Sequence, residues 1–222
     1  MFIFVFDEWS FIMEIEFGIL KREELMESVE VAARAYEYYE YFTNFFPDLE
    51  ERRKVLRSIM HRVELTNFGK THLLTAKVDG KMVAVAQIDD PQDKRPSVFQ
   101  FLIHGWLTVY CGVKMKHVND WLAMDTIASK PCHDYQKAGS DIWYTCSVTV
   151  DPAFQRMGVG SKFIAFWEDY IRERGGKELI LFTNSEKNLA FYKKNRFEIF
   201  DERDVALPGG NKMRSWSVKK TL

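Results

Sequence analysis

Cysteine is scarce in this sequence of 222 residues. The three cysteines, Cys111, Cys132 and Cys146, lie far apart, and no Cys-x-x-Cys pair occurs. Disulfide frameworks and cysteine-based zinc sites both need closely patterned cysteines, so we expect neither, and we expect no metal. Isolated cysteines favour a reducing compartment, and the sequence therefore predicts a cytoplasmic protein.

An excess of charge of one sign is absent as well. The 31 Lys and Arg residues are balanced by 32 Asp and Glu residues, which gives a formal net charge of −1. Domains that bind nucleic acid usually carry a basic surplus, so nucleic acid is not a predicted partner. No apolar run approaches the roughly 20 residues of a membrane-spanning helix, so no membrane partner is expected either.

Aromatic residues, in contrast, make up 15% of the chain. This content indicates a large core or an aromatic-lined pocket. The length fits a single domain, which we expect to occupy residues 1–222. Within it, the apolar residues 1–12 form an N-terminal extension, which is either an extra edge strand or the product of an upstream start.

The most specific pattern lies in the last third of the chain. An extended segment over residues 143–150 leads into the turn Gln155–Gly160, of the form Gln-x-x-Gly-x-Gly, which opens an amphipathic helix. The turn is not a Walker loop, because the lysine that should follow the last glycine directly is Lys162. It is not the dinucleotide fingerprint either, because Phe163 stands where that motif has its third glycine.

The segments that follow make this turn informative. A second extended segment, residues 178–182, is followed by Thr183–Asn188 and then by Phe191 and Tyr192 on a short helix. In this order the chain resembles the GCN5-related N-acetyltransferase (GNAT) superfamily, closely over the last third and loosely elsewhere. The resemblance implies an α/β (α+β) fold with a mixed, central, splayed β-sheet flanked by helices.

Two positions depart from the pattern of that family. Met157 stands where a basic residue or glycine is common, and Asn195 replaces a glycine after the short helix. Because a helix can end on a left-handed asparagine, we expect Asn195 to adopt that conformation.

The resemblance also implies acetyl-CoA as the co-substrate. A helix N-terminus offers free N–H groups and a positive dipole end to a diphosphate, and glycines allow close approach of the backbone. A free strand edge can pair with the amide-bearing arm of the coenzyme. The residues implied in binding are Val148, Val150, Gln155, Arg156, Met157, Gly158, Val159, Gly160, Ser161, Asn184 and Asn188.

For catalysis, the family implies Tyr192 as the acid that protonates the departing thiolate. The alternative for a tyrosine on a short helix is a packed ring whose hydroxyl is tied by a hydrogen bond. The central strand shows no carboxylate that could act as the base. His104, Asp125, His133 and Asp141 lie in or beside the region that is hardest to interpret, and a water chain is a further alternative.

The front half of the chain matches the order expected for the family. It reads as a strand over residues 14–20, a helix over 22–43, a second helix capped by Asp48, and a hairpin that turns at Asp79-Gly80. The tyrosine-rich segment 36–42 either packs in the core or walls the acceptor pocket.

Residues 91–140 are predicted to be helical over 98–113 and 118–127, with glycines that weaken the first of these helices. The family usually connects these parts of the fold more briefly. We therefore interpret residues 91–140 as a helical insertion that covers the acceptor side, with a thickened core as the alternative.

Together these features predict an acyl-CoA-dependent N-acyltransferase. It would transfer acetyl directly from acetyl-CoA to a primary amine of a small molecule. The alternative is a non-catalytic acyl-CoA-binding sensor or interaction module on the same fold. The identity of the acceptor, the acyl chain length and the oligomeric state stay open, and a homodimer is compatible with the sequence.

Overall fold

The computed structural model describes residues 13–222. Both interpretations of the N-terminal extension, an edge strand and an upstream start, concern residues 1–12 and lie outside the described residues.

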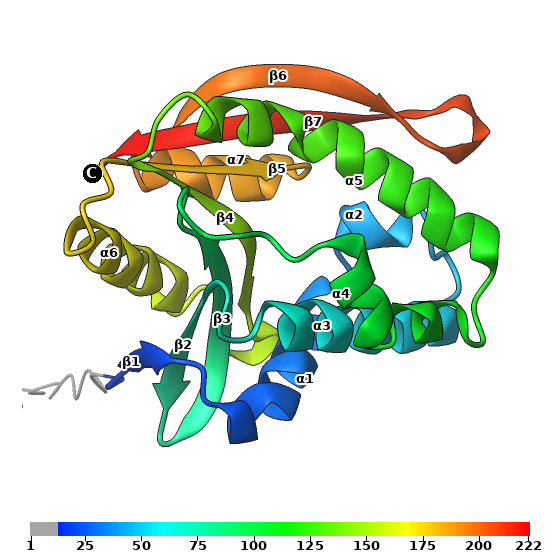
Figure 1. Ribbon diagram of the computed structural model, residues 1–222, viewed down its shortest axis with the longest axis horizontal. Coiled ribbons are helices and arrows are strands. Elements are labelled where there is room, and N and C mark those ends of the chain that lie inside the picture. Colours follow the sequence, from blue (N-terminus) through cyan, green and yellow to red (C-terminus); the bar gives the residue numbers. More distant parts are fainter. Residues whose placement is uncertain (1–12) are drawn as a thin grey trace, which may run out of the picture.

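A seven-stranded sheet with the order β1-β2-β3-β4-β5-β7-β6 forms the centre of the fold (Figure 1). Only the pairing of β4 with β5 is parallel, so the sheet is mixed, as the sequence predicted. The strands are β1 (Glu16–Ile19), β2 (His72–Val78), β3 (Lys81–Asp89), β4 (Ile142–Val150), β5 (Glu178–Thr183), β6 (Glu198–Ala206) and β7 (Lys212–Thr221).

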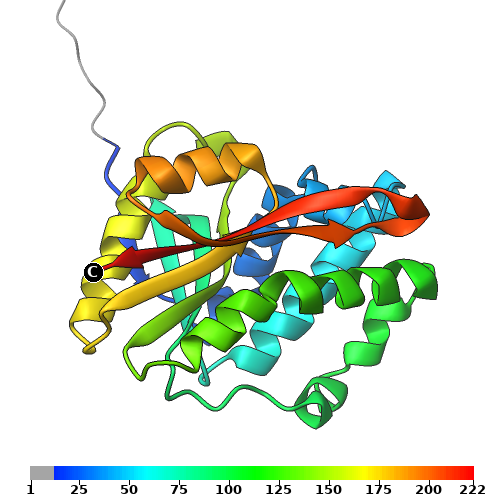
Figure 2. The ribbon, with the colours of Figure 1, turned by 90° about the horizontal axis from the view of Figure 1, so that it is seen from above.

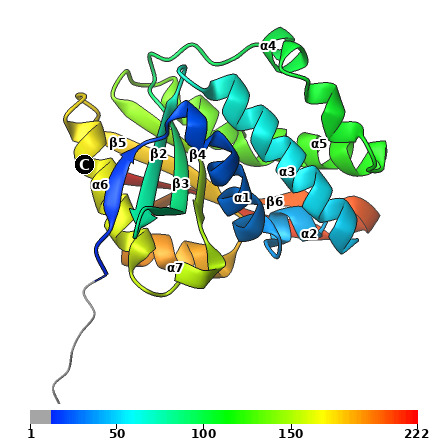
Figure 3. The same cartoon turned by 90° about the horizontal axis from the view of Figure 1, so that it is seen from below.

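Helices cover both faces of this sheet. One face packs against α6 and α7, whereas α1, α3 and α5 lie on the other, and Figure 3 shows α1 and α3 side by side. Figure 2 shows the β6–β7 hairpin extending alongside α5. The helices are α1 (Leu25–Tyr36), α2 (Glu40–Thr43), α3 (Leu49–Asn67), α4 (Val98–Ile103), α5 (Met115–Gln136), α6 (Val159–Arg172) and α7 (Glu186–Lys194).

The centre of the sheet opens at β4. Pairing between β4 and β5 stops at Tyr144, so the rest of β4 separates from β5, which confirms the predicted splay. A β-bulge lies at the same point, because Gln87 pairs with Ser147 and Ile88 with Thr145, which leaves Cys146 unpaired. A bulge bends its strand and re-aims the side chains that follow it.

The bulge has a direct consequence for the face that carries α1 and α5. Tyr144 packs against Cys132 of α5, and the Ser147 hydroxyl lies 2.8 Å from the Tyr36 hydroxyl of α1. In a regular strand, two residues three positions apart would face opposite ways. The extra residue therefore brings both polar side chains to one face.

Two local signals in the front half are confirmed. Asp48 accepts a hydrogen bond from the Glu51 amide at 2.7 Å and caps α3. Asp79 and Gly80 turn the β2–β3 hairpin with positive φ values of 51° and 73°. Both features depend on residues adjacent in sequence, which is why the pattern alone could reveal them.

Other boundaries differ from the prediction. The helix expected over residues 22–43 is broken, because the chain turns extended at Tyr39 between α1 and α2. The helix expected over 98–113 breaks at Gly105, whose φ of 81° is left-handed, and a 3-10 helix over residues 106–110 follows it. The helix expected over 118–127 belongs to the longer α5.

The prediction for Asn195 is wrong. Its φ of −89° is right-handed, and its side chain donates to the Phe191 carbonyl at 2.8 Å. The left-handed residue is the next one, Arg196, with φ of 66°. The left-handed residue that follows α7 therefore lies one position later than the sequence predicted.

No helix among residues 13–222 combines the length and the apolar character that crossing a membrane would require.

Candidate active site

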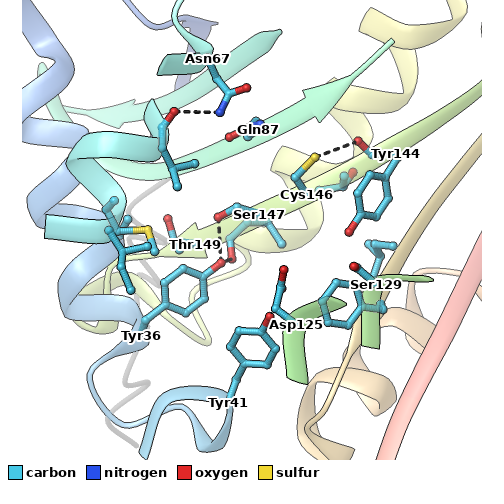
Figure 4. Close-up of a pocket in the computed structure, with 18 of the residues that line it drawn as sticks. Tyr36, Tyr41, Asn67, Gln87, Asp125, Ser129, Tyr144, Cys146, Ser147 and Thr149 are labelled. Carbon is cyan, nitrogen blue, oxygen red and sulfur yellow. Dashed lines mark hydrogen bonds between the residues drawn. The ribbon is translucent and has the colours of Figure 1, made fainter. Parts of the chain in front are cut away.

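A cavity of about 450 Å³ lies between the bulged part of β4 and the helices on that face. Figure 4 shows Tyr36, Tyr41, Asp125, Tyr144 and Ser147 directed toward its centre from α1, α2, α5 and β4. Asn188 and Tyr192 of α7 also line the cavity, which therefore reaches the splayed region between β4 and β5.

Helix α5 contributes one wall through residues spaced four apart. Trp121, Asp125, Ser129 and His133 follow one another by one helical turn and all line the cavity. The neighbouring stripe of α5, which includes Met124 and Ala128, packs in the hydrophobic core. Residues 91–140 thus both line the cavity and add to the core, and their role as an insertion over the acceptor side stays a prediction.

The tyrosine-rich segment after α1 forms a second wall. Tyr36, Tyr39 and Tyr41 line the cavity, and adjacent rings stack at centroid distances of 5.9 and 5.8 Å. Tyr38, in contrast, is exposed. The tyrosines that face inward therefore pack in the core and line the cavity, and a role in walling an acceptor pocket stays a prediction.

The backbone of β4 beyond the bulge presents a free edge. The Asp151 amide donates to the Val83 carbonyl of β3. Counting back along β4 in steps of two, Thr149 and Ser147 are therefore the residues whose backbone groups bond to β3. Because antiparallel pairs alternate, the backbone groups of Val148 and Val150 point away from β3. Their carbonyls accept instead from the Tyr36 hydroxyl at 3.4 Å and from Gln155 Nε2 at 3.0 Å, respectively.

The glycine turn provides a set of free amides beside this edge. Arg156 and Gly158 are left-handed, with φ values of 64° and 82°, and α6 begins directly after them. The amides of residues 156–161 have no hydrogen-bond partner among the residues that the structure describes. Consecutive free N–H groups at a helix N-terminus attract an anion, so this turn fits a diphosphate.

The two glycines of the turn serve different purposes. Gly158 has the left-handed φ, and nothing lies within 4 Å of the position that a Cβ would take. Gly160 lacks room instead, because a Cβ there would lie 3.0 Å from Phe191 Cζ of α7. Gly160 therefore allows α6 and α7 to approach each other closely.

Tyr192 is buried, with 6% of its surface exposed, and its hydroxyl forms no hydrogen bond with residues 13–222. This differs from the alternative interpretation of Tyr192, in which a hydrogen bond holds the hydroxyl of a packed ring. Burial raises the pKa of Tyr192, with smaller contributions from Tyr39 and Tyr36. The phenol is therefore neutral near pH 7 and carries a proton to donate.

The two asparagines of the α7 region lie differently. Asn188 lines the cavity beside Tyr192. Asn184 precedes α7, and its side-chain Nδ2 donates to the Arg214 carbonyl of β7 at 3.2 Å. It is not part of the cavity wall, so the structure brings Asn188 but not Asn184 to the place where Tyr192 lies.

The four candidates for the base separate into two pairs. Asp125 and His133 line the cavity, whereas His104 lies 3.1 Å from the Thr66 hydroxyl and Asp141 pairs with Lys177 at 3.2 Å, both elsewhere. Burial lowers the pKa of His133 to about 4, helped by the charge of Arg95. Burial raises the pKa of Asp125, whose partner is the Tyr41 hydroxyl.

Sequence reasoning missed Glu64, a cavity residue of α3. Its side chain is buried, and the Ser28 hydroxyl of α1 donates to it. Burial raises its pKa to about 8. A signal was present, since Glu64 follows Met60 by four residues and thus interrupts the apolar stripe of α3 with a carboxyl group.

Among residues 13–222, no group of three or more His, Cys, Asp and Glu side chains is arranged to hold a metal ion.

The fold is shared with solved acetyltransferase structures. The ribosomal-protein-S18-alanine N-acetyltransferase from Escherichia coli superposes with a TM-score of 0.55 at 13% identity, and the match covers 94% of each chain. The PaiA N-acetyltransferase from Thermoplasma acidophilum, in complex with coenzyme A, gives a TM-score of 0.53 at 13% identity, covering 95% of this chain and 100% of the other. YncA from Salmonella typhimurium, a putative acetyltransferase with acetyl-CoA, gives 0.55 at 13% identity, with 94% of each chain covered.

The splayed mixed sheet with its glycine turn thus defines the fold class of the acetyltransferases. The sequence model of the acetyltransferase (GNAT) family matches residues 31–197, and this chain belongs to that family of N-acetyltransferases. No curated protein sequence matches the chain.

Proposed function

We propose that this protein transfers an acetyl group from acetyl-CoA to a primary amine of a small molecule. The observation that carries the proposal is the junction of the free amides of residues 156–161, the free edge of β4 and the cavity beneath α3 and α5. The glycine turn lies beside the strand edge at Val150, and the cavity reaches the same edge at Val148. This combination suits a long anionic thioester on one side and an amine on the other.

The residues have distinct roles in this proposal. The amides of Met157 to Ser161 bind the diphosphate, with Arg156 supplying a charge beside it, and Gln155 holds the turn to the Val150 carbonyl. The N–H groups of Val148 and Val150 pair with the extended arm. Asn188 contacts that arm within the cavity. Asn184, whose side-chain Nδ2 is held by the Arg214 carbonyl just before α7, stays a proposed cofactor contact outside the cavity.

Acetyl-CoA supplies the acyl group as an activated thioester. Tyr192 donates its proton to the thiolate, for which its untied hydroxyl and raised pKa suit it. In this proposal a further N–H group of β4 near Val148, separate from those that pair with the arm, stabilises the tetrahedral oxyanion.

Several features favour a small acceptor over a protein chain. In this proposal residues 91–140 act as an insertion in a single domain, and α5 lines the cavity over about three turns, from Trp121 to His133. The E. coli structural neighbour modifies a ribosomal protein. A protein tail is therefore the competing acceptor class, and it needs an open groove in place of a walled cavity.

A screen for release of free thiol tests the proposal. The protein is incubated with acetyl-CoA and, in parallel, with small primary amines and with peptides that carry a free N-terminus or a lysine. We expect turnover with at least one small amine and little with peptides. Turnover with peptides alone would contradict the proposed acceptor class, and binding of acetyl-CoA without any turnover would favour a non-catalytic module.

A further inference from the structure

The cavity contains more acidic groups than basic ones. Three carboxyl groups line it, those of Glu64, Asp89 and Asp125, against one guanidinium group, that of Arg95. One more group could add a positive charge, His133, but it is neutral near pH 7 because burial lowers its pKa to about 4.

The one guanidinium group is already paired. Arg95 Nε lies 3.4 Å from Asp89 Oδ2, and its other nitrogens contact His133 and the Gln136 side chain. It also lies over the ring of Tyr144 at 5.7 Å. Arg95 and Asp89 therefore balance each other, and two carboxyl groups are left over.

These two carboxyl groups have no cationic partner among residues 13–222. Glu64 is 5% exposed and is bonded by the Ser28 hydroxyl, whereas Asp125 is bonded by the Tyr41 hydroxyl. Burial raises the pKa of both groups, that of Glu64 to about 8, because an ionised carboxyl group without a counter-charge is costly inside a protein. Glu64 therefore holds a proton near pH 7 in the free protein, and an ammonium group beside it would favour the carboxylate. Both groups line the same cavity, although they belong to different helices.

Two other atoms in the cavity wall point independently to a ligand. Thr145 Oγ1 and Trp121 Nε1 are buried without a hydrogen-bond partner in the described part of the chain. A threonine hydroxyl can accept from an ammonium group, and an indole N–H can donate to the lone pair of a neutral amine. The rings of Tyr36, Tyr39 and Tyr41 add faces that attract alkylammonium ions.

We infer that the acceptor is a linear diamine or polyamine, with separate amino groups bound at Asp125 and at Glu64. Glu64 lies on α3 and Asp125 on α5, and each has a different hydrogen-bond partner. The two carboxyl groups therefore form separate sites, each of which would bind one amino group. The inference rests on the proposed function and adds the class of the acceptor to it.

The reaction changes the charge that this site recognises. The attacking amine forms a bond to the acyl carbon and loses a proton, while the carbon–sulfur bond breaks and the thiolate gains a proton. The product is a neutral amide at one end and an ammonium at the other. Because one carboxyl group then loses its cation, the singly acetylated product binds more weakly than the diamine, and a second acetylation is slow.

The test compares two acceptors with the same four-carbon chain, 1,4-diaminobutane and 1-aminobutane, with the full-length protein and acetyl-CoA. Since a hydrogen bond to a charged group contributes roughly a factor of 10 to 100, we expect the diamine to have kcat/KM about 10-fold or more above the monoamine. Asp125→Asn and Glu64→Gln should each lower this ratio about 10-fold. Equal kcat/KM for the two acceptors in the wild type would overturn the inference.

Asp134→Asn is the matched control. It makes the same change on the same helix, but Asp134 lies outside the cavity and pairs with Lys130 and Lys137. We expect it to keep the wild-type ratio. A ratio that falls equally in Asp134→Asn and Asp125→Asn would show a general charge effect and would contradict the inference.

Calorimetry separates this inference from the proposed function. In the presence of coenzyme A, 1,4-diaminobutane should bind the wild type, and Asp125→Asn should weaken that binding about 10-fold. If diamine binds in this way but no small amine is acetylated, the proposed function fails, and of the inference only the diamine-binding site at Asp125 and Glu64 stands. If a monoamine is acetylated but the diamine neither binds nor reacts better, the proposed function stands and the inference fails.

Discussion

At the scale of single residues, Tyr192 is the side chain on which the proposed chemistry depends most directly. We predict that Tyr192→Phe retains acetyl-CoA binding but slows thiol release about 100-fold, because a general acid typically contributes that much or more. Thiol release is measured at saturating acetyl-CoA with an amine that the wild type acetylates. Binding is measured separately by calorimetry.

Tyr110→Phe is the control for that variant. The Tyr110 hydroxyl donates to Asn119 at 2.9 Å, outside the cavity, so the same loss of a hydroxyl should leave the rate unchanged. Unchanged turnover in Tyr192→Phe would remove this residue from the acid role.

The raised pKa of Glu64 leads to a prediction about how the stability of the fold depends on pH. Burial raises its pKa to about 8 in the folded protein, from 4.5 in the absence of that environment. The folded state thus holds a proton that the unfolded state has lost between these values, and stability is full below about pH 4.5 and falls as pH rises toward 8. Relative to Glu64→Gln, the free energy of unfolding of the wild type should decrease by up to about 1.4 kcal/mol per pH unit in this window.

Denaturant unfolding of both proteins at pH 5, 6, 7 and 8, without acetyl-CoA or amine, measures this difference. Parallel pH profiles for wild type and Glu64→Gln would show that Glu64 titrates normally. The sequence could not predict the effect, because Glu64 is buried where α3 packs against α1, whose Ser28 lies 36 residues away in the chain.

At the scale of elements, the start of α6 is a place where the stability of the helix and the binding of the diphosphate can be tested separately. Ser161 lies in the first turn, beside the free amides of residues 156–161. We predict that Ser161→Asp weakens acetyl-CoA binding more than about 10-fold, because a carboxylate competes with the diphosphate for these amides. The same carboxylate should leave the melting temperature equal or higher, since an acidic residue favours a helix N-terminus.

Ser161→Asn provides a control of nearly the same shape without the charge, and it should retain most of the affinity. Affinity is measured by calorimetry and stability by thermal melts without ligand. If both variants lost the same affinity for acetyl-CoA, the larger side chain and not the charge would be the cause. If Ser161→Asp kept the wild-type affinity, the diphosphate would bind at another place.

The elements also show where sequence patterns stop being informative. The cap at Asp48 and the turn at Asp79-Gly80 were predictable because each is decided by neighbouring residues. The bulge at Cys146 was not, since it is defined by pairing with β3, almost 60 residues earlier. Helix α5 was recognised in part, but its cavity stripe could be assigned only once its core stripe was known.

At the scale of the whole molecule, the mixed sheet and its splay could be predicted because the motif order of the last third implies them, and the family match over residues 31–197 agrees. The place of the cavity was predictable in outline. Its chemistry was predictable only in part. Asp125 was among the candidate bases, whereas Glu64 reaches the cavity from α3, which the β2–β3 hairpin and about half of residues 91–140 separate from α5. The sequence thus revealed the acyl donor side more fully than the acceptor side.

The last prediction concerns the stability of the whole fold. A ligand that binds only the native state stabilises it by about 2.7 kcal/mol at a concentration 100 times its Kd. For a chain of 222 residues, each kcal/mol shifts the melting temperature by roughly 2–4 °C, so acetyl-CoA should raise it by about 5–10 °C. Thermal melts over a series of acetyl-CoA concentrations measure the shift, and Ser161→Asp should require at least about 10-fold more ligand for the same rise. An unchanged melting temperature at millimolar acetyl-CoA would contradict the proposed donor, because the free amides, the edge of β4 and the cavity would then hold no common ligand.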